Sequence, residues 1–179
     1  MALLSQYLRG LARDQRGVSA VEFALIAPVM VALYLGAAEM TMALNADRKV
    51  TGAANTVADL VAQDDFISDD ELTDIYAAGD AILFPNDPTE LALRITSVRM
   101  DADGDIFVDW SEGRGLSALS PDDVPALPEG LLSPMDSIVM VEARYPFNGP
   151  FPKDAGPLAV LGDTAYLRPR RSAWVRRES

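Results

Sequence analysis

Residues 13–38 read RDQRGVSAVEFALIAPVMVALYLGAA, and this stretch determines how the rest of the chain is organised. A basic leader ends at Gly17, and from Val18 to Ala38 the only charged residue is Glu22. A helix crosses the core of a bilayer with about 20 mostly apolar residues. The run reaches that length only if Glu22 lies inside it, and a charge inside a membrane helix is unfavourable without a partner. The stretch therefore predicts a membrane-crossing helix with one acid near its start.

The same stretch has three simpler interpretations. A secretory signal peptide would use the arginines of the leader and a cleavage site at residues 36–38, but Glu22 interrupts its apolar core and the helical pattern continues past the cut. An uncleaved anchor explains the length and the basic flank, yet it gives Glu22 no role. A buried core helix is disfavoured because the run is apolar all round, as membrane spans are.

Gly17 and Glu22 together suggest a processing site. Residues 16–23, RGVSAVEF, resemble the cleavage site of class III prepilins, which are cut after a glycine on the cytoplasmic side. There an acid is fifth in the mature chain and an aromatic residue follows it. By this resemblance Gly17 and Val18 flank the cut, while Glu22 and Phe23 serve recognition or packing. Cleavage would create an ammonium group at Val18, and the Glu22 carboxylate on the same or a neighbouring helix would neutralise it in a low dielectric.

The charge of the chain is unevenly distributed. The 179 residues carry a net charge of −12, but the leader to Gly17 has three Arg and one Asp, or +2, so that −14 remains from Val18 onward. Residues 168–179 are basic again, with five Arg and one Glu. The acidic middle argues against a nucleic-acid partner. A positive leader before the apolar run predicts a cytoplasmic N-terminus and an external main domain.

The sequence contains neither Cys nor His. This excludes disulfides, thiolate nucleophiles, imidazole bases and the common zinc sites. We therefore expect neither an enzyme nor a cofactor.

The periodicity of the chain predicts four regions: a leader at 1–17, a transmembrane helix at 18–42, its extension outside the membrane at 43–66, and a soluble α+β domain with a basic tail at 67–179. The extension is amphipathic, and its apolar face is formed by Val50, Ala53, Ala54, Val57, Leu60 and Val61. One helix is thus expected over residues 18–63, with a length of roughly 65–70 Å. Pro28 lies inside it and would kink or locally open it.

Turn and strand signals follow. Ser68 and Glu71 form a capping box that predicts a helix at 69–78, closed by Gly79. Alternating apolar residues predict a hairpin of strands at 91–100 and 106–110, then a long loop at 111–134. A central strand is expected at 138–145, broken by the prolines after Tyr145, and a last strand at 164–168. The prediction is a pilin-like α+β fold in which a long helix lies on about four antiparallel strands.

Two loops imitate binding motifs. Five acids have the spacing of positions 1, 3, 5, 9 and 12 of an EF-hand calcium loop: Asp101, Asp103, Asp105, Asp109 and Glu112. However, Ile106 occupies the position that requires glycine, and the flanks are strands. A hairpin turn needs Asp and Gly in any case. The GRGLSA run at 113–118 spells a dinucleotide fingerprint without its helix, so it is expected to be a loop.

The arginines of the tail are expected to be solvated, with an acidic lipid or an acidic partner as the alternative.

The whole chain resembles the TadE-like minor pilins of tight-adherence (Flp) systems. The resemblance rests on residues 16–23, on the apolar run that ends near Glu39, and on the RPRR sequence at 168–171. It implies cleavage after Gly17 by an inner-membrane aspartic prepilin peptidase and a role in assembling an adhesive pilus. The departures from the family are Pro28 and an Ala-rich run.

Several partners and a location follow from the same resemblance. The expected partners are the prepilin peptidase, other pilins and pseudopilins, the inner-membrane assembly platform and the lipid bilayer. The chain would cross the inner membrane once, with its domain in the periplasm or incorporated into a surface pilus. Two alternatives remain: an uncleaved membrane-anchored pilus-assembly protein, and a secreted enzyme or ligand-binding domain behind a signal peptide.

Overall fold

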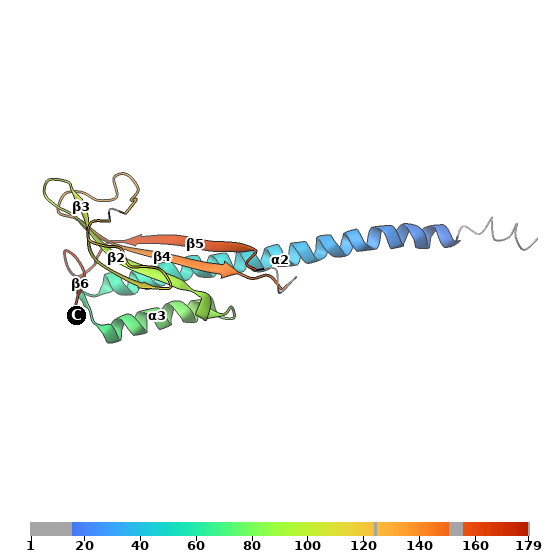
Figure 1. Cartoon of the computed structure of the whole chain (residues 1–179), viewed down its shortest axis with the longest axis horizontal. Helices are drawn as coiled ribbons and strands as arrows, with labels where there is room; N and C mark the ends of the chain where they lie inside the picture. Colours follow the sequence, from blue (N-terminus) through green and yellow to red (C-terminus); the bar gives the residue numbers. More distant parts are fainter. Residues whose placement is uncertain (1–15, 124, 151–155, 179) are drawn as a thin grey trace, which may run out of the picture. The chain divides into compact units, whose positions relative to one another are not determined.

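The computed structural model describes residues 16–123, 125–150 and 156–178. The chain divides into two compact units, Met1–Thr41 and Met42–Ser179. Residues 1–15 of the expected leader lie outside the described residues. The first unit contributes the start of one helix, α2 (Arg16–Gln63), and the second contains every strand of the described chain (Figure 1).

Helix α2 confirms the predicted long helix and runs without interruption through Pro28. A proline removes one main-chain donor from the helix ladder, but no local opening accompanies it here. In the second unit, small residues of α2 are fully buried at three- and four-residue intervals: Ala46, Val50, Ala53, Ala54, Val57, Ala58, Val61 and Ala62. Leu60, which the periodicity placed on this face, is only partly buried.

The sheet has four antiparallel strands in the order β3-β2-β4-β5. They are β2 (Ala92–Met100), β3 (Ile106–Arg114), β4 (Ser137–Phe147) and β5 (Ala159–Leu167). Strand β4 pairs with β2 on one edge and with β5 on the other, so it is a central strand. Its apolar residues alternate between two buried clusters, one on each face of the sheet. The predicted α+β fold is confirmed.

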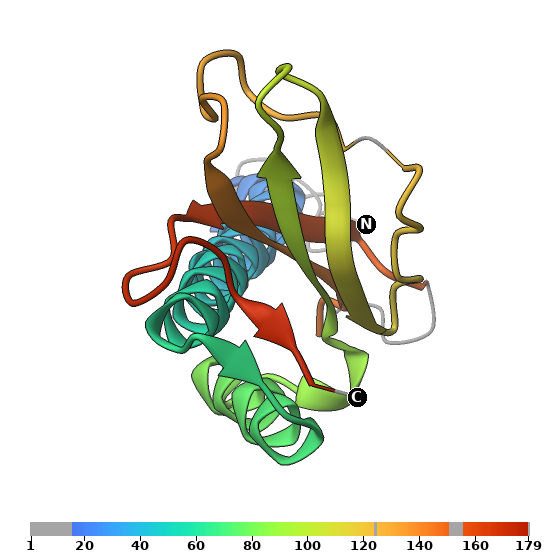
Figure 2. The same cartoon turned by 90° about the vertical axis from the view of Figure 1, so that its left-hand side faces the viewer.

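Both faces of the sheet are covered. On one face, Leu93, Ile95 and Val141 pack in a cluster with buried residues of α2 and of α3 (Asp69–Leu83). On the other face, Val98 and Met140 pack against leucines of the long segment between β3 and β4, including Leu119, Leu127, Leu131 and Leu132. Figure 2 shows the two helices on one side of the sheet and this segment on the other.

The second helix is longer than predicted. The capping box of Ser68 and Glu71 is present, but α3 continues through Gly79 to Leu83. Gly79 is buried, and a Cβ atom there would lie 3.0 Å from Val57 Cγ2 and 3.1 Å from Leu93 Cδ1. The glycine therefore permits a close approach between α3, α2 and the sheet instead of ending the helix.

Strand β3 also extends further than predicted, to Arg114, and contains a β-bulge. Ser97 pairs with Trp110 while Val98 pairs with Val108, so Asp109 is the additional residue. A bulge of one residue moves the following side chains to the opposite face. Trp110 consequently packs with the helix-side cluster, whereas Ile106 packs with the other one. Strict alternation over residues 106–110 would have kept both side chains on one face.

Two further strand boundaries differ from the prediction. Strand β4 does not break at Pro146 but reaches Phe147. The pairing of β4 with β2 stops at Arg144, so Pro146 lies where β4 has β5 as its single neighbour, and a proline is tolerated there. Strand β5 begins at Ala159 instead of Thr164. It therefore includes the apolar residues Val160 and Leu161.

The C-terminal segment is part of the fold. Four of its five arginines have exposed side chains, as expected of a solvated tail, whereas the side chain of Arg177 is only 14% exposed. Strand β6 (Arg176–Arg177) pairs in parallel with β1 (Phe66–Ile67) (Figure 2). Val175 is fully buried, and its main-chain oxygen accepts a hydrogen bond from Trp110 Nε1 at 2.7 Å. The guanidinium of Arg99 lies over the ring of Trp174, with 4.0 Å between Cζ and the ring centroid.

Candidate membrane and assembly segment

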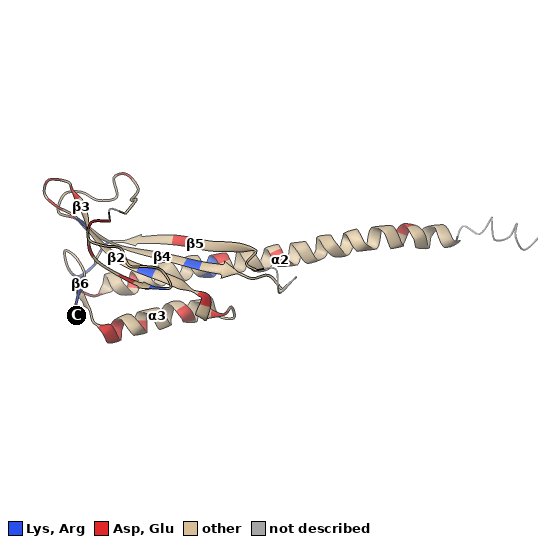
Figure 3. Ribbon diagram, viewed as in Figure 1, with Lys and Arg blue, Asp and Glu red and all other residues tan. Residues whose placement is uncertain are grey.

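The first half of α2 exposes a large apolar surface. Its described side chains are exposed or half-buried through residue 45, and the large exposed ones include Val18, Val21, Phe23, Leu25, Ile26, Val29, Met30, Val31, Leu33, Tyr34 and Leu35. The helix is long and apolar enough to cross a membrane. Figure 3 shows this part of α2 almost without charge. Monomeric soluble proteins rarely expose a contiguous apolar surface of this size, and such surfaces are typical of sites that bind a membrane or another protein.

The predicted processing site lies at the start of this segment. Because α2 begins at Arg16, the Gly17–Val18 peptide bond lies in its first turn. A Cβ atom on Gly17 would meet no atom within 4 Å among the residues that the structure describes. Packing against these residues therefore does not require glycine at this position.

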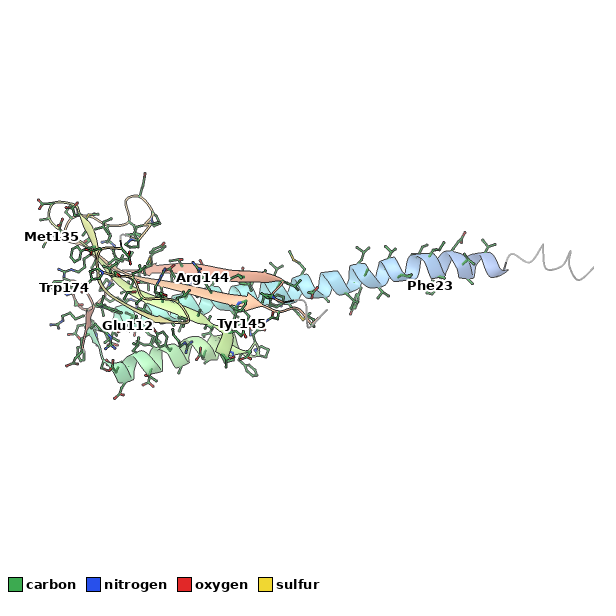
Figure 4. The ribbon with its side chains drawn as sticks, viewed as in Figure 1. Phe23, Glu112, Met135, Arg144, Tyr145 and Trp174 are labelled. Atoms are coloured by element: carbon green, nitrogen blue, oxygen red, sulfur yellow. The ribbon has the colours of Figure 1, made fainter. Side chains whose placement is uncertain are left out.

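Glu22 and Phe23 follow one turn later. Val18 and Glu22 are four residues apart, which places them on one face of the helix. Phe23 is 72% exposed, and its ring projects away from the helix in Figure 4. Both Glu22 and Phe23 are thus presented outward, where another molecule can contact them.

A comparison with protein families identifies this segment. The family described as TadE-like protein matches residues 17–59. The N-terminal segment is TadE-like. The match begins at Gly17 and continues into the buried half of α2, so the resemblance to TadE-like proteins is confirmed over these residues. No curated protein and no solved structure matches the chain.

The TadE-like match ends before α3 and the sheet. The match therefore supports a protein associated with tight-adherence pili. It does not extend to the elements that form most of the domain surface. One apolar helix near the N-terminus is consistent with a membrane-anchored pilus protein.

The five acids of the calcium candidate are not brought together. The Asp101 carboxylate accepts hydrogen bonds from the main-chain N–H groups of Asp103 and Asp105, as in an ordinary Asp-rich turn. Asp109 instead pairs with Arg99 at 3.1 Å, and Glu112 with Arg177 at 3.1 Å. Within the described residues, no three acids are arranged to hold a metal ion.

The GRGLSA run is irregular from Gly115 onward, as the sequence predicted, but its first two residues belong to β3. Arg114 donates to Asp80 of α3 at 2.8 Å, and its guanidinium lies over the ring of Tyr76. Burial of that ring raises the pKa of Tyr76 above its ordinary value. The run therefore attaches the edge of the sheet to α3.

An ionic network at the other end of α2 was missed. Each arginine of the tail lies near an acid, in the pairs Arg168–Asp136, Arg170–Asp59, Arg171–Asp64, Arg176–Asp65 and Arg177–Asp69. The signal in the sequence was the acidic run at residues 64–71 together with a basic tail of matching size. The distance along the chain between the two concealed their pairing.

Proposed function

We propose that the chain is a minor pilin, or pseudopilin, that acts as a structural subunit or assembly factor of a Flp-type adhesive pilus, and that it is cleaved after Gly17 by a prepilin peptidase. The observation that carries the proposal is the exposed apolar half of α2, whose TadE-like match begins at the proposed cleavage residue. Such a surface suits a subunit that passes from lipid into contact with other helices.

Glu22 has a defined part in this proposal. Cleavage gives Val18 a free ammonium group, and the Glu22 carboxylate projects from the same face one turn later. In the bilayer an isolated carboxylate is costly, so pairing with that ammonium group, in the same chain or in a neighbouring pilin, favours ordered packing. Phe23 adds apolar contact area beside the pair.

The proposed location follows from the charges. The chain crosses the inner membrane once, with the leader in the cytoplasm and residues 43–179 in the periplasm or in the pilus. Its proposed partners are the prepilin peptidase, other pilins and pseudopilins, and the inner-membrane assembly platform. We assign the domain a structural role and no catalytic one, since the sequence has no Cys or His.

The first test is the N-terminal residue of the protein that accumulates in its native cell. Intact mass and N-terminal sequencing should give Val18. A start near Glu39 would indicate a signal peptide and a free domain, and a chain that keeps Met1 or Ala2 would indicate an uncleaved assembly protein. Either result contradicts cleavage after Gly17.

A matched pair of variants strengthens this test. Gly17→Leu should leave the longer precursor, whereas Gly36→Leu should be processed normally. A Cβ atom added at either glycine would meet no atom of the described residues within 4 Å, so neither substitution creates a clash with them. Equal processing of both variants would contradict the proposed site.

Glu22→Ala separates the pilin from the fixed anchor. We expect the variant to remain in the membrane fraction but to lower pilus assembly or precursor processing, because the Val18 ammonium group loses its partner. The amount of assembled pili and the amount of membrane-bound protein are both measured in the same culture. Normal assembly would favour the uncleaved anchor.

A further inference from the structure

Exposed apolar side chains gather at the end of the second unit that carries Met42. Helix α3 runs back from Asp69 and is followed at this end by Phe84, which is 78% exposed. Strand β4 ends nearby at Phe147, whose main-chain oxygen accepts from the N–H of Leu158 at 2.9 Å. Leu158 and Val160 are 52% and 68% exposed.

These elements are held together. The ammonium group of Lys49 in α2 donates a hydrogen bond to the main-chain oxygen of Phe84, which attaches the turn after α3 to the helix. A recess of about 650 Å³ is lined by Met42, Lys49, Pro85 and Phe147, among others. Phe84 is therefore fixed at its backbone while its ring stays in solvent, although burial of an aromatic ring is normally favourable.

The position of Met42 in the chain indicates what covers this surface. The apolar run ends at Ala38, and four further residues of helix advance by about 6 Å. If residues 18–38 cross the bilayer, this short connection keeps the end of the domain that carries Met42 close to the lipid headgroups. Phe, Trp and Leu side chains of membrane-surface proteins enter the boundary between headgroups and acyl chains at that depth, where an exposed apolar ring leaves water.

We propose that this end of the domain rests on the outer surface of the bilayer, with Phe84 in the headgroup region and Val160 beside it. The proposal depends on the membrane placement given under Proposed function and adds a second contact beyond the helix. In this arrangement, lipid covers the exposed apolar end of the domain until the subunit is incorporated into a pilus.

The charges at this end do not favour one kind of lipid. Positive and negative side chains are mixed on the elements that meet there, namely Asp47, Arg48, Lys49, Asp87, Glu90, Arg144 and Asp163. Their fields largely cancel, so apolar contact and not attraction to anionic lipid provides the binding. We therefore expect the contact to form on zwitterionic phosphatidylcholine.

The absence of cysteine from the sequence makes the test direct. Full-length Phe84→Cys and Val160→Cys are labelled with the fluorophore NBD and reconstituted in phosphatidylcholine nanodiscs that contain lipid with a nitroxide headgroup. Met135→Cys is the matched control, since Met135 is 72% exposed. It lies next to the far end of β2, about 30 Å of strand away. Figure 4 shows Met135 and Tyr145 at opposite ends of the domain.

The nitroxide should quench the label at 84 and 160 at least about twofold more than at 135, since only interfacial groups lie close to it. Phe84→Ser should reduce quenching at 160, whereas Met135→Ser should not. Equal quenching at all three positions overturns the proposal. A blue-shifted but unquenched label at 84 also overturns it, because a second protein copy would then cover the surface. A chain absent from the nanodiscs contradicts the membrane placement itself.

Discussion

At the scale of single residues, Gly79 sets how closely α3 approaches α2. Its missing side chain leaves room for Val57 and Leu93, with only 3.0–3.1 Å from a Cβ position to their methyl groups. Gly79→Val should lower the free energy of unfolding by about 1–3 kcal/mol, because added methyl groups overpack a tight core. Urea denaturation followed by circular dichroism measures the change.

Ala81→Val is the control for Gly79→Val. Ala81 is exposed on the same helix, so the substitution should cost less than about 0.7 kcal/mol, the range of helix propensity. A similar decrease in the free energy of unfolding of both variants would mean that the α2–α3 contact tolerates a larger side chain.

Glu71 makes the stability of α3 depend on pH. Hydrogen bonds from the main-chain N–H and the hydroxyl of Ser68 lower the pKa of Glu71 below its ordinary value near 4.5. A lowered pKa stabilises the folded state above the ordinary value, and this contribution is lost as the pH falls through the lowered one. The stability difference between wild type and Glu71→Gln should be largest near neutral pH and should shrink below about pH 4.5.

Thermal melts between pH 7 and pH 3 measure this difference. Asp70→Asn removes a charge from the same turn without removing the capping bond, so it should change the stability less near neutral pH. A difference for Glu71→Gln that grows as the pH falls would contradict the capping role.

At the scale of elements, β6 holds the end of the domain through Arg177. Its guanidinium donates to Glu112 at 3.1 Å, to the main-chain oxygen of Ile67 at 3.0 Å, and to Asp69. The hydrogen bond to Asp69, followed by that to Glu112, raises the pKa of Arg177 above its ordinary value. Arg177→Gln should cost about 1.5–3 kcal/mol of unfolding free energy, the range for hydrogen bonds to charged groups.

Arg171→Gln is the matched control in the same tail. The Arg171 side chain is 72% exposed and lies 3.8 Å from Asp64, so its loss should cost about 0–1 kcal/mol. Salt should weaken the pair at Arg171 more than the network at Arg177. Guanidinium titrations cannot separate these effects because the denaturant is itself a salt, so urea is the denaturant to use.

Local patterns explain which elements were predictable. Helix α2 and the start of α3 were predicted because helical periodicity and capping depend on residues close together in the sequence. Ser68 and Glu71 are the example for capping. The bulge at Asp109 and the length of α3 were missed because both depend on partners distant in the chain. By local rules, for example, Gly79 should end the helix. The helix continues instead, and the glycine is explained by its close contact with Leu93, which is distant in the chain.

The candidate site divides in the same way. Gly17, Val18, Glu22 and Phe23 form a contiguous motif, which allowed the sequence alone to select them, and their roles stay predictions. The exposed end around Phe84 combines residues from α2, α3 and β5. A sequence pattern cannot bring them together, because their proximity depends on the topology of the sheet.

At the scale of the whole molecule, the core belongs to the second unit. The buried residues of both clusters all lie at Ala46 or later. A chain of residues 42–179 should therefore keep its cooperative unfolding transition and stay soluble without detergent, whereas the full chain should need detergent because of its exposed apolar helix. Sedimentation and thermal melts of both proteins measure the two properties. Aggregation of residues 42–179 would show that the first unit stabilises the fold.

The burial of Val175 has a consequence for the order of events during export. The residue completes the cluster begun by α2, and β6 beside it joins β1 more than a hundred positions earlier. In the proposed placement, residues that follow the membrane segment cross in chain order, so the buried half of α2 leaves the cytoplasm long before Val175. Closure of the domain would then wait until residues 174–177 had crossed, and until that point the apolar face of α2 would stay uncovered in the periplasm.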